Sequence, residues 1–152
     1  MPEPTEDAAS TVTSKSFDEL SAREFHDLVR LRTDVFVVEQ ECPYPELDGR
    51  DVDPGTEHHW ITDTDGRAVC VARSLVDPDG LVRIGRVATD PSARGRGLAA
   101  DLMRSILARI GDGPVVIDAQ SHLHDWYVQF GFERCGDEFV EDGIPHIPMR
   151  RP

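Results

Sequence analysis

The chain has 152 residues, of which 39% are hydrophobic and 30% are charged, a balance typical of one soluble globular domain. Its 29 acidic and 16 basic residues give a formal net charge of -13, which disfavours nucleic acid as a partner because a phosphate backbone would be repelled. The longest aliphatic runs, such as 35–38 and 115–117, are too short to cross a bilayer, and the acidic N-terminal sequence is neither a signal nor a transit peptide. We therefore expect a cytoplasmic protein with no nucleic-acid or membrane partner.

The charged residues are unusual in kind, since a single lysine, Lys15, accompanies fifteen arginines and eighteen aspartates. Such a surface repels itself unless salt screens it. This composition predicts a halophilic protein adapted to a salty cytoplasm. A melting temperature that does not fall between molar and low salt would contradict that prediction.

The chain holds three cysteines, Cys42, Cys70 and Cys135. An odd number leaves at least one of them unpaired. Without an export signal, all three are predicted to be reduced and packed.

The first third of the chain is predicted to supply a tail, a strand and a helix. Residues 1–14 are acidic and poor in apolar side chains, so they are expected to form a flexible tail before a folded domain at 15–152. A first strand is expected at 16–20. A helix then begins at the capping-box pair Ser21 and Glu24 and continues with apolar residues at helical spacing, namely Phe25, Leu28 and Leu31.

A long loop at 46–55 carries three aspartates, Asp48, Asp51 and Asp53, which raises the question of a calcium site. The twelve-residue register of a calcium loop and its closing glutamate are absent. We therefore expect a solvated loop.

Strands and a crossover helix follow. Strands are expected at 57–62 and 67–76 around a hairpin turn, and a third strand is expected at 81–88. Apolar residues at four-residue spacing predict a helix at 95–110, so the next strand, 115–119, must run parallel to the third.

The C-terminal part is predicted to contain a short helix at 125–130 and two strands at 132–140 and 145–150. The whole chain then reads as α/β in the broad sense, or α+β. We expect a mixed, mostly antiparallel sheet with one parallel β-α-β crossover.

An arginine- and glycine-rich turn within residues 86–99 joins the third strand to the crossover helix. A helix that begins on small residues leaves its first N–H groups unpaired, and Gly95 and Gly97 let an anion approach the backbone. Residues 83–104 hold five arginines against two acids, which indicates a small anionic ligand on an acidic protein. The turn fits neither a P-loop nor a G-x-G-x-x-G fingerprint. It predicts a pyrophosphate site, unless its glycines serve only as turn residues.

Several separated segments resemble one family. Together with the order of elements, Arg94-x-x-Gly97-x-Ala99 resembles the Gln/Arg-x-x-Gly-x-Gly/Ala motif of the GNAT superfamily of N-acetyltransferases. The segment 126–132 resembles the aromatic helix and Gly-Phe turn of that family's next motif. Segments within 31–49 and at 141–146 are similar to the ElaA-type branch, so the resemblance spans about residues 20–150.

The resemblance implies a GNAT-like central sheet with helices on both faces and acetyl-coenzyme A as co-substrate. The backbone of Val87, Ala88 and Thr89 would pair with the pantetheine arm, which a splay between the two parallel strands admits. Backbone N–H groups of the turn would hold the pyrophosphate, supplied by Arg94, Gly95, Arg96, Gly97, Leu98 and Ala99.

Tyr127 is the catalytic residue that the resemblance implies, as the general acid that protonates the leaving thiolate. A phenol near the sulfur can donate to the developing anion. The alternative is that Trp126, Tyr127 and Phe130 form a packed aromatic helix without a catalytic role.

The general base is left open among four residues, Glu39, His58, His122 and His146, with a water chain as a further option. Each of the four is also readily explained as a surface or structural residue. His58 and His59 do not indicate a metal site, because adjacent residues of a strand point to opposite faces.

The implied activity is transfer of an acetyl group to a primary amine, on a small molecule or a peptide, by direct attack in a ternary complex. Glu39 and the aspartate-rich loop are expected to border the acceptor site, where their charge would favour a cationic amine. The alternative is a non-catalytic acyl-coenzyme A-binding sensor or interaction module. The sequence leaves the oligomeric state open, a homodimer included.

Overall fold

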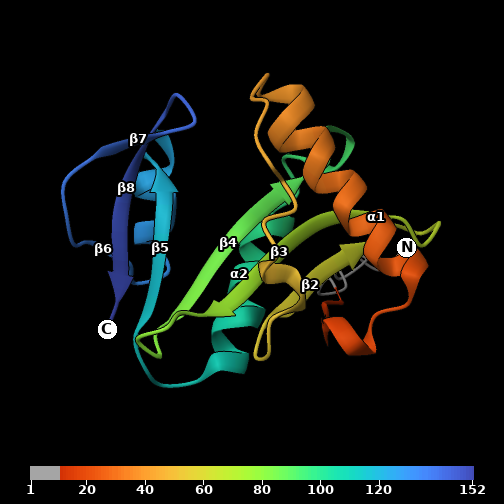
Figure 1. Ribbon diagram of the computed structural model, residues 1–152, viewed down its shortest axis with the longest axis horizontal. Coiled ribbons are helices and arrows are strands. Elements are labelled where there is room, and N and C mark those ends of the chain that lie inside the picture. The colour runs from red at the N-terminus through yellow and green to blue at the C-terminus, as the bar shows by residue number, and fades with distance from the viewer. Residues whose placement is uncertain (1–10) are drawn as a thin grey trace, which may run out of the picture.

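The computed structural model describes residues 11–152 (Figure 1). One eight-stranded sheet has the order β1-β2-β3-β4-β5-β8-β6, with β7 paired to β8. All strand pairs are antiparallel except β4 with β5, so the predicted mixed sheet with one parallel crossover is confirmed. The strands are β1 (Thr13–Ser16), β2 (Glu57–Thr62), β3 (Ala68–Val76), β4 (Val82–Thr89), β5 (Val115–Gln120), β6 (Glu133–Arg134), β7 (Phe139–Glu141) and β8 (Ile144–Arg151).

Helices cover both faces of the sheet. In Figure 1, α1 (Ala22–Thr33) crosses in front of the strands and α2 (Leu98–Ile110) lies behind them. A short α3 (His124–Val128) follows β5. Single turns of 3-10 helix complete the fold, at Phe17–Glu19, Arg50–Val52, Pro91–Ala93 and Ser121–Leu123.

The start of α1 follows the predicted capping box. The backbone N–H of Glu24 donates to Ser21 Oγ at 3.0 Å, and the backbone N–H of Ser21 donates to Glu24 Oε1 at 2.9 Å. These two bonds satisfy N–H groups that the first turn leaves unpaired. At its other end α1 continues into a π-helical turn, Asp34–Glu39, which carries the chain towards β4.

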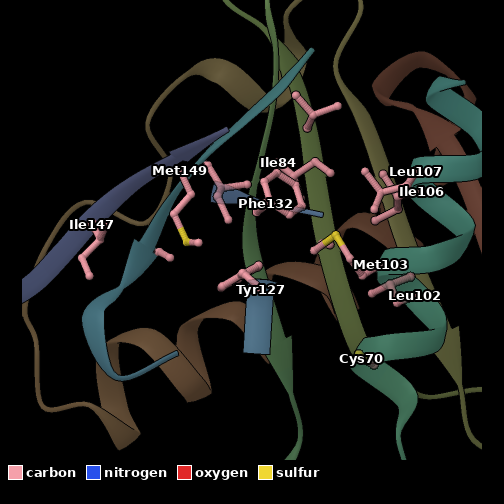
Figure 2. Close-up of a cluster of buried hydrophobic side chains, with 14 of the residues drawn as sticks. Cys70, Ile84, Leu102, Met103, Ile106, Leu107, Tyr127, Phe132, Ile147 and Met149 are labelled. Carbon is pink, nitrogen blue, oxygen red and sulfur yellow. The ribbon is translucent and has the colours of Figure 1, made fainter. Parts of the chain in front are cut away.

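Two apolar layers form the core, one on each side of the sheet. Cys70 and Ala72 of β3 belong to the cluster under α2, and Val71 between them belongs to the cluster under α1, as the alternation of a strand requires. Figure 2 shows side chains of α2 directed at the sheet, together with Tyr127 and Phe132 from the C-terminal part. The core thus ties α2 and α3 to the same strands.

Some predicted boundaries were wrong. β1 begins at Thr13 and ends at Ser16, because Ser16 caps a 3-10 turn with Glu19 where the strand was expected to continue. The helix expected from residue 95 begins at Leu98, since Gly97 has a left-handed φ of 72°. The strand expected at 132–140 is two short strands. The predicted tail falls mostly on residues 1–10, which lie outside the described residues.

The cysteines are free, and Cys42 and Cys70 are buried. Cys135 is exposed, so the expectation that all three are packed was wrong for this residue. It follows the two-residue strand β6, where little chain is available to cover it.

Two adjacent histidines of β2 are buried, His58 and His59. The ring nitrogens of His59 lie 2.7 Å from Ser14 Oγ and 2.8 Å from Ser74 Oγ. Burial lowers the pKa of His59 to about 4 and also lowers the pKa of His58.

We expect the free energy of unfolding to fall as the pH drops from 6.5 to 4. The unfolded chain binds a proton at His59 near pH 6.5 whereas the folded chain does not until about pH 4, a loss of about 3 kcal/mol from this residue. Urea unfolding at stepped pH should show a shallower dependence for His59→Gln than for the natural chain, and an unchanged one for exposed His26→Gln. Parallel curves for all three proteins would contradict the assignment.

Candidate active site

A cleft opens where the two parallel strands separate. β4 and β5 pair only at Val82 with Val115 and Arg83 with Val116, after which they diverge (Figure 1). The cleft has a volume of about 1090 Å³ and is lined by β4, β5, α3, β8, the π-helical turn and the loop after it. This divergence matches the splay that the resemblance implies.

A β-bulge shapes the β4 side of the cleft. Val71 pairs with Ala88 and Arg73 pairs with Gly85, so Arg86 and Val87 both lie opposite Ala72. Arg86 adopts a left-handed φ of 54°, which a non-glycine residue rarely does. A bulge leaves one residue outside the strand ladder, so backbone groups here are free to face a ligand.

The glycine-rich turn lies at the end of β4 that adjoins the wide part of the cleft. Gly95 and Gly97 have φ angles of 81° and 72°, and a Cβ at either position would meet nothing within 4 Å. Among residues 11–152, the N–H groups of Gly95 to Ala99 have no acceptor. Arg96 is exposed and forms no ion pair with any acidic residue within 11–152. The turn therefore presents unpaired donors in open space, the arrangement expected of an anion site.

The turn is tied to the π-helical turn by a bidentate ion pair. Arg94 Nη1 and Nη2 each lie 2.5 Å from an oxygen of Glu39, and Arg94 Nε donates to Thr89 O at 3.1 Å. The hydrogen bond from Arg94 lowers the pKa of Glu39. A carboxylate held in this way is a weak base.

Tyr127 lies on α3 and lines the cleft. Its ring packs edge-on against Trp126 and Phe132, with centroids 4.9 and 6.1 Å apart. Burial raises its pKa to about 12, and its hydroxyl makes no hydrogen bond to residues 11–152. The Tyr127 ring is thus packed in an aromatic cluster, as expected if its role were only structural. Its hydroxyl nevertheless stays protonated and lies at the cleft.

The candidate bases are scattered. His122 and His146 line the cleft, and His146 Nδ1 lies 2.7 Å from Ile144 O. His58 is buried, with Nε2 3.1 Å from Asp51 O, and is not among the residues that line the cleft. Of the four candidate bases, Glu39, His122 and His146 therefore line the cleft, and the ion pair with Arg94 makes Glu39 a weaker base.

The aspartate-rich loop is only partly solvated, because Glu46 and Asp51 are buried whereas residues 47–49 and 52–55 are exposed as expected. Arg32 is fully buried and donates to Glu46 Oε1 at 2.6 Å and to Asp51 Oδ1 at 2.7 Å. Arg73 donates to Asp51 and, through two nitrogens, to Asp48. Although burial alone would raise the pKa of Asp51, the hydrogen bonds from Arg32 hold it below its usual range. The loop carboxylates are therefore neutralised by arginines.

Sequence reasoning missed this network, although two signals were available. Arg32 follows Leu28 by four residues, which places a charge on the apolar face of α1. Arg73 follows a run of five apolar residues in β3, 68–72. Arginines at core positions indicate buried partners.

The described chain shows two further features that bear on function. Within residues 11–152, no group of three or more His, Cys, Asp or Glu side chains is arranged to hold a metal ion. No helix there has the length and apolar character needed to span a membrane. A second hollow of about 790 Å³ lies along α1, with Phe17, Phe25 and Val29 among its lining residues.

Comparison with known proteins places these features in a family. Residues 28–151 match the acetyltransferase (GNAT) domain. A UPF0039 protein of Mycobacterium tuberculosis is 50% identical over 137 residues, which cover 88% of each chain. Protein ElaA of Escherichia coli is 40% identical over 139 residues, covering 88% of this chain and 90% of ElaA.

Solved structures agree. The crystal structure of an acyl-CoA N-acyltransferase from Pseudomonas aeruginosa has a TM-score of 0.88 at 42% identity, covering 94% of this chain and 99% of that one. The crystal structure of Escherichia coli ElaA has a TM-score of 0.88 at 36% identity with the same coverage. This chain therefore belongs to the GNAT family of acetyltransferases, with ElaA among its relatives.

Proposed function

We propose that the protein is an acetyl-coenzyme A-dependent N-acetyltransferase that acts on a primary amine of a small molecule or peptide. One observation carries the proposal: a single cleft is lined by the β4 bulge, by Tyr127 and by the two ends of the glycine-rich turn, Arg94 and Ala99. Family membership supports acyl-coenzyme A as the donor.

The donor is proposed to lie along the end of β4. Backbone groups of Val87, Ala88 and Thr89 would pair with the pantetheine arm, as a further strand would, because β5 has diverged there. The N–H groups from Arg94 to Ala99 and the free side chain of Arg96 would bind the pyrophosphate. Glu39 would hold Arg94 at this turn and border the acceptor site, a role that fits its ion pair better than that of base.

The chemical step is a direct attack. The amine nitrogen bonds to the thioester carbonyl carbon, and N–H groups of the bulge stabilise the oxygen as it gains charge. The carbon–sulfur bond then breaks, and the thiolate accepts the proton of Tyr127. The ammonium group loses one proton before attack, which passes to a cleft histidine or to water. The nitrogen releases a second proton as the amide forms, and this proton returns through water to Tyr127, which restores its phenol.

The proposed acceptor site is bordered by less unpaired negative charge than the sequence implied. The carboxylates of the loop that borders the cleft are already paired with arginines, for example Asp48 with Arg73. The prediction of a cationic amine therefore rests on fewer free charges than the composition of the loop implied.

Two measurements test the proposal. Titration calorimetry with acetyl-coenzyme A measures binding, and coenzyme A release with a panel of amines, small molecules and peptides, measures turnover. Binding with acetylation of an amine, detected by mass spectrometry, supports the proposal. Binding without turnover across the panel would favour the non-catalytic sensor, and absence of binding would overturn both.

We expect Gly97→Ala to weaken acetyl-coenzyme A binding by about tenfold, since its Cβ would stand where the pyrophosphate approaches the backbone. The matched control is Gly66→Ala in the β2–β3 turn, because both glycines have a left-handed φ and open space around Cβ. Each change should cost about 1 kcal/mol of stability from backbone strain. Calorimetry that shows equal losses of affinity in the two variants would contradict this role for Gly97.

A further inference from the structure

The β4 bulge contains a residue in the left-handed conformation at a position where glycine is the usual choice. Among residues 11–152, the non-glycine residues with positive φ are Glu41, Arg86 and Asp142. Glu41 and Asp142 lie in turns, whereas Arg86 lies within a strand. Glycine would adopt this conformation without cost, so an arginine here indicates that its side chain holds the backbone in place.

The side chain of Arg86 forms hydrogen bonds and an ion pair with the loop after the π-helical turn. Arg86 Nε donates to Glu46 Oε1 at 3.1 Å, and Arg86 Nη2 lies 3.4 Å from Glu46 O and 3.5 Å from Asp48 Oδ2. The guanidinium group also lies 5.4 Å from the centre of the Tyr44 ring. Contacts from three loop residues therefore fix one side chain of the strand.

The anchor is itself rigid. Glu46 is 7% exposed, and its carboxylate also accepts from fully buried Arg32 and from the hydroxyl of Tyr44. A carboxylate with its oxygens occupied in the interior has little freedom to move. The loop is therefore a fixed point against which β4 is set.

The bulge faces the cleft, with Gly85, Arg86 and Val87 all on its lining. The bulge lies between Arg83, the last residue of β4 that pairs with β5, and the end of β4. The acyl group would lie at this point if the donor lies along β4. Any side chain that sets the bulge also sets the direction of the backbone groups that meet the acyl carbonyl.

We propose that Arg86 is a positioning residue, and that its ion pair with Glu46 fixes the bulge in the geometry that recognises the acyl group of the donor. The inference rests on the proposed function, because it assumes that an acyl-coenzyme A occupies the cleft. It adds that the loop bordering the acceptor site controls the donor site through one arginine.

The test compares the affinities of acetyl-coenzyme A and free coenzyme A, measured by calorimetry without an acceptor. Only the acetyl compound carries the carbonyl that the bulge would meet. Arg86→Gly removes the anchor and the strain together, so its fold should survive while its bulge loses a fixed geometry. We expect the preference for acetyl-coenzyme A to fall about tenfold, with the affinity for coenzyme A unchanged.

Arg150→Gly in β8 is the matched control, since it removes an exposed strand arginine that does not line the cleft. Its preference should equal that of the natural chain. Arg86→Lys keeps the charge but not the fork, and should show an intermediate loss; it also serves if Arg86→Gly does not fold.

The outcomes separate the two proposals. A natural chain that binds neither compound overturns the proposed function. A natural chain that binds both equally, or an Arg86 variant that folds and keeps the natural preference, overturns the role of Arg86 alone. A parallel loss of affinity for both compounds would also overturn it, because that pattern is expected of general structural damage.

Discussion

Replacement of Arg32 by methionine is expected to cost about 3–5 kcal/mol of the free energy of unfolding. Arg32 is 0% exposed, and its guanidinium group is paired with Glu46 and Asp51, which are 7% and 3% exposed. The methionine fits the space of the aliphatic stem but leaves two carboxylates buried without that partner. Urea unfolding at pH 7 gives the change directly.

A surface pair supplies the comparison for Arg32. Arg109 of α2 pairs with Glu57 at 2.6 Å, yet its side chain is 51% exposed. Because solvent screens such a pair, Arg109→Met should cost much less stability than Arg32→Met. If the two variants lost similar stability, the buried network would have no special structural weight.

The crossover helix and the glycine-rich turn were predictable because their signals are local. The apolar residues at helical spacing within 98–110 directly follow the glycines at 95 and 97. One short stretch of sequence therefore specifies both the helix and the turn before it. The capping box of α1 is local in the same way. Such features need no knowledge of what packs against them.

The bulge and the buried network were not predictable, because they depend on partners far along the chain. Arg32 meets carboxylates 14 and 19 residues away, and Arg86 meets Glu46 across 40 residues. The loop therefore looked solvated by composition, although the fold brings arginines from α1, β3 and β4 around it. The β4 bulge likewise exists only once β3 and β4 are paired, because it is a shift in the register between these two strands.

In the candidate site, the motif residues could be recognised in the sequence, whereas their contacts could be seen only in the fold. Motif residues Arg94, Gly97 and Ala99 were visible as a pattern, but the partner of Arg94 was not. Glu39 was predicted to border the acceptor site, and the structure shows that it forms an ion pair with Arg94 of the glycine-rich turn, the proposed donor site. The link between these two proposed sites depends on residues 55 positions apart, so the sequence did not reveal it.

Tyr127→Phe is expected to lower kcat by about 10²-fold or more, with the affinity for acetyl-coenzyme A unchanged. Burial raises the pKa of Tyr127 to about 12, so the hydroxyl stays protonated at neutral pH and is available to the thiolate as it leaves. Stability should change little, because within residues 11–152 the hydroxyl has no hydrogen-bond partner to lose. The measurement is steady-state turnover with an acceptor found in the amine panel.

The control for Tyr127 must disturb packing without removing the hydroxyl. Phe132 is 1% exposed, packs edge-on against the Tyr127 ring at 6.1 Å and does not line the cleft. Phe132→Leu should therefore lower stability by about 1 kcal/mol or more while kcat falls by less than about tenfold. The reverse pattern, with Tyr127→Phe fully active and Phe132→Leu inactive, would make the aromatic cluster structural and remove the general acid from the mechanism.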